Sequence, residues 1–139
     1  MNRINAITFV GLCLTLLLRA AGAELTHTPQ PGSKERKAIM DALRVPVSKV
    51  VKRKVIFEVG HVRVRDGWAF VSGNAVLPDG SALGAEHLWG EFAALLRRQT
   101  GKRGKTWRVL HWGFATDTSV YDECRTKYPH APHSIFGGG

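Results

Sequence analysis

Three side chains that commonly bind metals lie near the C-terminal end of the chain. Cys124, His130 and His133 fall within ten residues, and the two histidines are separated by two residues. A thiolate and two imidazoles are soft ligands of the kind that zinc prefers. A structural zinc site takes four ligands, usually from two closely spaced pairs, and this segment offers one such pair. The sequence therefore predicts no metal and no cofactor, with a metal-binding tail as the alternative.

The sequence carries no recognisable catalytic motif. The Gly-x-Ser-x-Gly, His-Glu-x-x-His and phosphate-loop patterns are all absent. Cys124 follows Asp122 and Glu123, whose negative charges raise the pKa of a thiol, so we interpret it as a structural or incidental thiol. His61 and His111 lie in predicted strands and could face each other across a sheet, where histidines are more often hydrogen-bonded than catalytic. These features favour binding over catalysis.

Positive charge is concentrated in two segments of the chain. One is a run of three basic residues before a β-rich stretch, and the other lies beside and within a glycine-rich loop. If both segments lie at the same end of a sheet, they form one cationic patch for an anionic polymer or an acidic protein surface. Two solvated loops are the alternative. The basic residues are Lys52, Arg53, Lys54, Arg97, Arg98, Lys102, Arg103 and Lys105.

Aromatic residues in the predicted strands form a second candidate binding surface. Strand aromatics usually fill a core or one face of a sheet. If a helix covers only one face, the aromatic residues of the other face form an exposed patch for a partner. The candidates for this aromatic face are Trp68, Trp107 and Trp112.

The first 23 residues have the layout of a secretory signal peptide. Arg3 precedes an apolar run over residues 6–18, and Ala21 and Ala23 supply the small residues of a cleavage site. The run is shorter than the ~20 residues that span a bilayer. We therefore expect an exported protein, periplasmic or secreted, with no stable membrane insertion after cleavage.

Charge and cysteine content narrow the class of partner. The 139 residues have a formal net charge of +9. Cleavage after Ala23 removes two arginines, which leaves 18 basic against 11 acidic residues, a formal charge of +7 and one cysteine, Cys124. An intramolecular disulfide is then impossible, so core packing must hold the domain together. We expect a protein or an anionic envelope polymer as the partner, and no nucleic acid.

One helix and at least four strands are predicted to position these residues. Ser33 is a predicted N-cap for a helix over residues 34–44, which Pro46 is expected to end. Asp66 and Gly67 form a predicted hairpin turn, and Gly60 is a candidate bulge. The remaining expectations are strands over 50–64, 68–71, 92–98 and 107–114, a loop or short helical piece over 82–91, and an irregular tail from 116. In the last strand, alternation places Trp107, Val109 and His111 on one face and Trp112 and Phe114 on the other.

Four short stretches of the sequence carry a resemblance to known proteins. They are Glu-Arg-Lys-Ala-Ile-Met-Asp-Ala-Leu-Arg at 35–44, Asp-Gly-Trp-Ala-Phe-Val at 66–71, Leu-Leu-Arg at 95–97 and Trp-Arg-Val at 107–109. The chain resembles a group of small exported bacterial proteins of uncharacterised function over about residues 33–136. The arrangement is also similar to cystatin-like and NTF2-like domains, which present a curved antiparallel sheet against a helix. The resemblance implies a fold and no particular activity.

These observations predict the α+β class, with one N-terminal helix packed on an antiparallel sheet of four or more strands. The expected organisation is a signal peptide at 1–23, a flexible leader at 24–32, a single domain at 33–136 and a glycine tail at 137–139. The predicted function is a binding module for an acidic protein or an anionic envelope component. The alternative is a small NTF2-like enzyme or ligand-binding protein, with a pocket between sheet and helix that uses His61, His111 or a carboxylate.

Overall fold

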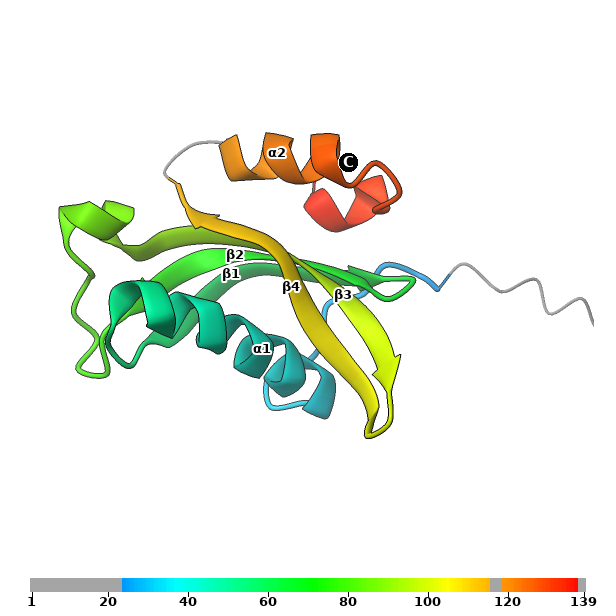
Figure 1. Cartoon of the computed structure of the whole chain (residues 1–139), viewed down its shortest axis with the longest axis horizontal. Coiled ribbons are helices and arrows are strands. Elements are labelled where there is room, and N and C mark those ends of the chain that lie inside the picture. The colour runs from blue at the N-terminus through cyan, green and yellow to red at the C-terminus, as the bar shows by residue number, and fades with distance from the viewer. Residues whose placement is uncertain (1–23, 116–118, 138–139) are drawn as a thin grey trace, which may run out of the picture.

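A computed structural model describes residues 24–115 and 119–137, which form an α+β fold with a four-stranded antiparallel sheet. The predicted signal peptide and the last two residues of the predicted glycine tail lie outside the described residues. The elements are α1 (Lys34–Val51), β1 (Ile56–Arg65), β2 (Trp68–Val76), η1 (Ala85–Gly90), β3 (Glu91–Gly101), β4 (Gly104–Phe114), α2 (Ser119–Lys127) and η2 (His133–Phe136). Figure 1 shows α1 on one face of the sheet, and α2 with η2 on the other.

Helix α1 begins as predicted but continues well past its predicted end. The side chain of Ser33 accepts a hydrogen bond from the backbone N–H of Arg36 at 3.2 Å, which caps the first turn. Pro46 lies inside the helix, so the prediction that it ends the helix is wrong. A proline in a helix interior costs about 3 kcal/mol. Val47 and Val51 are buried beyond it, and each contributes about 1.5–3 kcal/mol, so packing outweighs the proline.

The strands follow one another in the sheet in the order β1-β2-β3-β4, and all neighbours are antiparallel. Asp66 and Gly67 have φ angles of 50° and 75°, the left-handed pair that a tight hairpin turn requires, as predicted. The β1–β2 register shifts at Gly60, which confirms the predicted bulge. Because of this bulge, Val59 and Val62 both pack on the core beneath α1.

A second bulge, in β4, changes which aromatic residues share a face. Strict alternation would separate Trp107 and Val109 from Trp112 and Phe114. The pairing register shifts between Val109 and His111, so that one extra residue enters the strand. All four apolar side chains therefore pack on the core beneath α1. The predicted alternation of this strand is wrong for that reason.

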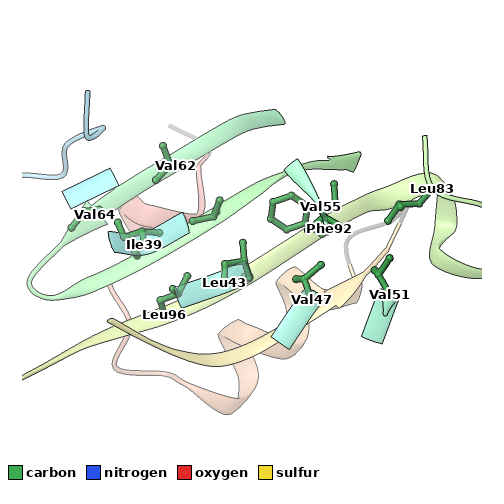
Figure 2. Close-up of a cluster of buried hydrophobic side chains, with 14 residues drawn as sticks. Ile39, Leu43, Val47, Val51, Val55, Val62, Val64, Leu83, Phe92 and Leu96 are labelled. Carbon is green, nitrogen blue, oxygen red and sulfur yellow. The ribbon is translucent and has the colours of Figure 1, made fainter. Parts of the chain in front are cut away.

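The first core lies between α1 and the sheet. Ile39, Leu43, Val47 and Val51 recur every four residues, which places them on one face of the helix, and all four are buried. Figure 2 shows these side chains in one cluster with Phe92 and other residues of the strands. This burial holds α1 against the sheet.

The opposite face of the sheet is covered by α2 and η2, so the prediction of an irregular tail is wrong. Val120 and Cys124 of α2 and Ile135 of η2 are buried in a second core with Phe70 and Leu95. Helix α2 has nine residues, too few for a stable isolated helix, and its position depends on this contact. The single helix expected from the sequence is accompanied by a second one on the other face.

Gly73 lies in β2 opposite the bulge of β1, where the backbone of β1 approaches closely. A Cβ at this position would overlap the carbonyl oxygen of Glu58. We expect Gly73→Ala to lower the free energy of unfolding by about 1–3 kcal/mol, because the strands must move apart. The measurement is urea-induced unfolding of both proteins.

Gly60→Ala is the matched control on the other side of the same bulge. Its Cβ would lie 3.9 Å from the carbonyl oxygen of Ser72, an ordinary contact. We expect a change below about 0.5 kcal/mol. Equal free energies of unfolding for the two variants would contradict this account of the bulge.

Candidate functional site

The two basic segments lie at opposite ends of the sheet. Residues 52–54 precede β1 and lie near the end of β2, because Ile56 pairs with Val76. The β3–β4 turn lies beyond the other end, because Trp68, at the start of β2, already pairs with Arg97. The structure therefore does not bring the two segments together into one patch. The exposed members of these two segments are Lys52, Arg53 and Lys54 at one end of the sheet, and the hairpin cations Lys102, Arg103 and Lys105 at the other.

Arg97 and Arg98 point to opposite faces of the sheet and make contacts within the fold. The Arg97 guanidinium lies 4.4 Å from the ring centre of Trp68 and donates a hydrogen bond to the carbonyl oxygen of Asp66 at 2.9 Å. The Arg98 guanidinium lies 5.6 Å from the ring centre of Trp107. Arg97 and Arg98 are therefore partly buried, whereas the hairpin cations at the same end of the sheet are exposed.

The three tryptophans predicted as one aromatic face lie on two different faces. Trp68 packs on the second core, where its ring centre lies 6.3 Å from that of Tyr128. Trp107 and Trp112 pack on the first core, beneath α1. Helices cover both faces of the sheet, so the described residues present no bare aromatic face. Trp107 and Trp112 nevertheless stay partly exposed along β4.

A groove of about 510 Å³ runs between α1 and β4, the last strand of the sheet. Val45 lies in it with 61% of its surface exposed. Because β4 pairs with β3 alone among the described strands, its other edge borders the groove. The apolar lining comes from Ala42, Val45 and Pro46 of α1 and from Trp107, Val109 and Trp112 of β4.

The helix side of this groove could not be found from the sequence, because the helix was expected to end before Pro46. The available signal was an apolar pair, Val45 and Pro46, that fits neither the buried stripe of α1 nor a polar turn. Its meaning depends on the helix continuing, which only the packing of Val47 and Val51 decides.

Basic residues lie in the groove and at the turn that precedes β4. Residues 92–116 include six basic and no acidic residues. Arg108 lines the groove itself, and the hairpin cations lie at the turn from which β4 starts. On α1, Asp41 already pairs with Lys37 at 2.5 Å and Arg44 at 2.6 Å, and these partners hold the pKa of its carboxyl below 3.8. The groove therefore combines an apolar lining, a strand edge that is unpaired among the described residues and nearby cations.

The predicted flexible leader contacts the fold at several points. We call residues 24–28 the N-terminal strap. His27 exchanges two backbone hydrogen bonds with Val64 of β1, at 2.9 and 2.8 Å. The hydroxyl of Thr26 lies 2.6 Å from that of Ser134 in η2. The strap therefore lies against β1, at the edge of the sheet opposite to the groove.

Two carboxylates lie beside the imidazole ring of His27 in the strap. Its Nε2 lies 2.9 Å from the Glu35 carboxylate, and its Nδ1 lies 3.4 Å from that of Glu24. The hydrogen bond to Glu35 raises the pKa of His27 above 6.5, and Glu24 adds to the effect. Partial burial acts in the opposite direction but does not outweigh these partners.

The histidines considered for catalysis lie apart. His61 is on β1 and His111 on β4, with two strands between them, so they do not face each other. His111 lies 2.6 Å from the Glu123 carboxylate of α2. His61 Nε2 lies 2.8 Å from the carbonyl oxygen of Ile135 and borders a pocket of about 290 Å³ between the sheet and α2. Ser72, Glu91 and Tyr121 line the same pocket, together with aromatic rings.

Cys124 is fully buried in the second core and does not form a metal-binding group with His130 and His133. The described residues contain no group of three or more histidine, cysteine or acidic side chains placed to hold a metal ion. The guanidinium of Arg125 lies 3.2 Å from Nδ1 of His133. Burial, together with the charge of Glu123, raises the pKa of the Cys124 thiol to about 12, so it is a poor nucleophile.

Comparison of the chain with protein-family models, with curated proteins and with solved structures found no match. Within residues 24–115 and 119–137, none of the helices combines the length and the apolar character needed to cross a membrane. The groove, the hairpin cations and the His61 pocket are the candidate binding features of the described residues.

Burial of Cys124 has a direct chemical consequence. A pKa of about 12 instead of 9.0 lowers the thiolate fraction about a thousandfold at neutral pH. In a Cys13→Ala background, where Cys124 is the remaining cysteine, we expect a disulfide reagent to modify it at least about a hundredfold more slowly in buffer than in urea. The measurement is the rate of release of a coloured thiol. Equal rates in both conditions would show an accessible thiol.

The raised pKa of His27 predicts how the strap responds to pH. Protonated His27 pairs with Glu35 in the folded state, so this pair stabilises the fold below pH 6.5, and the contribution is lost as the pH rises through the raised pKa. We expect Glu35→Gln to lower the pKa of His27, measured by NMR titration of its ring. Glu123→Gln, which removes the partner of His111, is the control and leaves the His27 titration unchanged. A pKa at or below 6.5 in the unmodified protein would contradict the pairing.

Proposed function

We propose that this chain is an exported binding module that holds an extended, acidic segment of a partner protein in the groove between α1 and β4. Export to the periplasm or the medium is inferred from the signal-peptide layout of residues 1–23. The bound segment lies along the edge of β4, places apolar side chains in the groove and directs its carboxylates at the hairpin cations. Catalysis has no part in this function.

One observation carries the proposal: the apolar groove and the hairpin cations adjoin on β4. Main-chain hydrogen bonds at a strand edge supply affinity for an extended segment, and side-chain pockets beside the edge supply selectivity. The groove offers about 510 Å³ for such side chains. Cations next to it speed the encounter with an acidic partner and make binding weaker at high salt.

A protein segment fits this groove better than a uniform anionic polymer. A polyanion has no apolar groups for Val45, Trp107 and Trp112, whose exposed surface in the groove would stay in contact with water. A segment that alternates apolar and acidic side chains satisfies both the groove and the hairpin cations, because alternate residues of an extended chain point in opposite directions.

A second candidate function uses the pocket beside His61. The side chains of Ser72 and Glu91 line this pocket and have no hydrogen-bond or ion-pair partner among the described residues. A small ligand could therefore bind to them, as expected for a ligand-binding protein or a small enzyme. The groove is the stronger candidate because the pocket is smaller and the ring nitrogen Nε2 of His61 is already engaged by Ile135.

The test uses a synthetic peptide of alternating valine and glutamate and measures its binding to the full chain by calorimetry at low and high salt. We expect binding at low salt that weakens at high salt. Arg103→Glu with Lys105→Glu should weaken binding at least about tenfold, a loss of about 1.4 kcal/mol. Arg53→Glu with Lys54→Glu, the same charge change at the other end of the sheet, should change it less than about twofold.

A second pair of variants tests the groove itself. Val45→Glu places a charge in the groove, whereas Val50→Glu changes a similarly exposed residue of α1 outside it. The two valines are 61% and 51% exposed. We expect the first to abolish binding and the second to preserve it. Equal effects of the two variants would overturn the assignment of the groove as the binding site. Binding of polyglutamate as tight as that of the alternating peptide would instead favour an anionic polymer, and no binding of either would favour the His61 pocket.

A further inference from the structure

We propose that Glu24 becomes the first residue of the working protein and that its new α-ammonium group forms an ion pair with Asp66. The inference rests on the proposed export, and it assigns Asp66 as a receptor for the chain terminus that processing creates. It is independent of the groove. The sequence places a cleavage site after Ala23, and the structure places the backbone nitrogen of Glu24 2.8 Å from Oδ1 of Asp66.

The chemistry of the cleavage converts a neutral donor into a charged one. A peptidase of the export pathway adds water across the Ala23–Glu24 peptide bond, and the C–N bond breaks. The hydroxyl of water joins the carbonyl carbon of Ala23. The nitrogen of Glu24 keeps its own hydrogen, takes the remaining hydrogen of water and becomes an amine. An α-amine with an ordinary pKa of about 7.7–8.0 is mostly protonated at neutral pH. The hydrogen bond from an amide to a carboxylate thereby becomes an ion pair at the same two atoms.

The strap holds this nitrogen in place through contacts on both sides of the chain. The backbone pairing of His27 with Val64 anchors the strap on β1, and Thr26 anchors it on Ser134. Ser134 also accepts a hydrogen bond from Arg65 at 3.2 Å. This residue of η2 therefore contacts both the strap and β1. These anchors lie within three residues of Glu24, which limits how far its nitrogen can move from Asp66.

The backbone of Asp66 is also fixed by contacts within the fold. It occupies the β1–β2 turn with a φ of 50°, and Arg97 donates a hydrogen bond to its carbonyl oxygen. Oδ1 of the Asp66 carboxylate lies 2.8 Å from the nitrogen of Glu24.

Charged groups from three elements contact the carboxylates of Asp66 and Glu24. Arg65 of β1 lies 3.6 Å from the second carboxylate oxygen of Asp66, so the ammonium shares this carboxylate with a guanidinium. The side chain of Glu24 points to Arg98 of β3 at 3.6 Å and to His27 of the strap at 3.4 Å. The two carboxylates favour the charged amine, while the two arginines reduce the effect.

The pair makes a prediction about pH. Asp66 stabilises the charged form of the amine in the folded state, so its pKa rises above the ordinary value. Its contribution to stability is present below about pH 7.7 and is lost as the pH rises through the raised pKa. In the uncleaved chain the same nitrogen belongs to an amide that does not titrate, so this pH dependence belongs to the processed form.

The test begins with the full 139-residue chain, exported and processed in a bacterial host. Mass spectrometry identifies its first residue, and the pH dependence of acetylation of the terminal peptide gives the pKa of the α-amine. We expect Glu24 as the first residue and a pKa about half a unit above the ordinary value.

Asp66→Asn is the key variant, because asparagine suits a left-handed turn position before glycine as well as aspartate does. It removes the charge and keeps the turn, so the pKa should return to the ordinary value. Asp79→Asn, the same change at the turn between β2 and η1, is the control and should leave the raised pKa in place.

A first residue other than Glu24 would overturn the assigned terminus, and an unshifted pKa in the unmodified protein, or one unaffected by Asp66→Asn, would overturn the ion pair. Neither result bears on peptide binding in the groove, so the failure of this inference is distinguishable from the failure of the groove as a binding site. A chain that keeps residues 1–23 would instead overturn the proposed export itself.

Discussion

An antiparallel sheet with apolar side chains on both faces must be covered twice, and this requirement shapes the rest of the chain. Helix α1 covers one face through a stripe of four buried aliphatic residues. The other face, which carries Phe70 and Leu95, is closed by α2 and η2. Each covering element gains its stability from the sheet rather than from its own propensity, because short helices are marginal in water. The need to bury this area also explains why α1 continues through Pro46.

Covering both faces leaves the two edges of the sheet as the places where the fold can meet other chains. The N-terminal strap occupies part of the β1 edge through His27 and Val64. The β4 edge borders the groove and adjoins the hairpin cations. An exposed strand edge is a template for another strand unless charge, curvature or a covering segment protects it. The hairpin cations repel a second basic chain, and in the proposed function the same charges select an acidic segment, so protection and selectivity would have the same physical origin.

Local chemistry made part of this structure predictable. Ser33, the Asp66-Gly67 turn and the bulge at Gly60 all follow from the conformations that these residue types prefer, and all three are confirmed. The end of α1, the bulge of β4 and the whole of α2 were missed. Each depends on contacts between residues far apart in the chain, such as Cys124 with the sheet, and local preference is silent about such contacts.

The candidate site divides in the same way. The sequence by itself determined that the chain is basic, that Lys102, Arg103 and Lys105 lie in a glycine-rich turn and that Trp107 and Trp112 belong to one strand, because composition and turn chemistry are local properties. Only the tertiary structure decided that Lys52, Arg53 and Lys54 lie at the other end of the sheet and that Trp68 faces the other core. Tertiary structure also placed Val45 and Pro46 beside β4 and Glu24 beside Asp66. Strand register and helix length set these positions, and burial of distant apolar residues decides both.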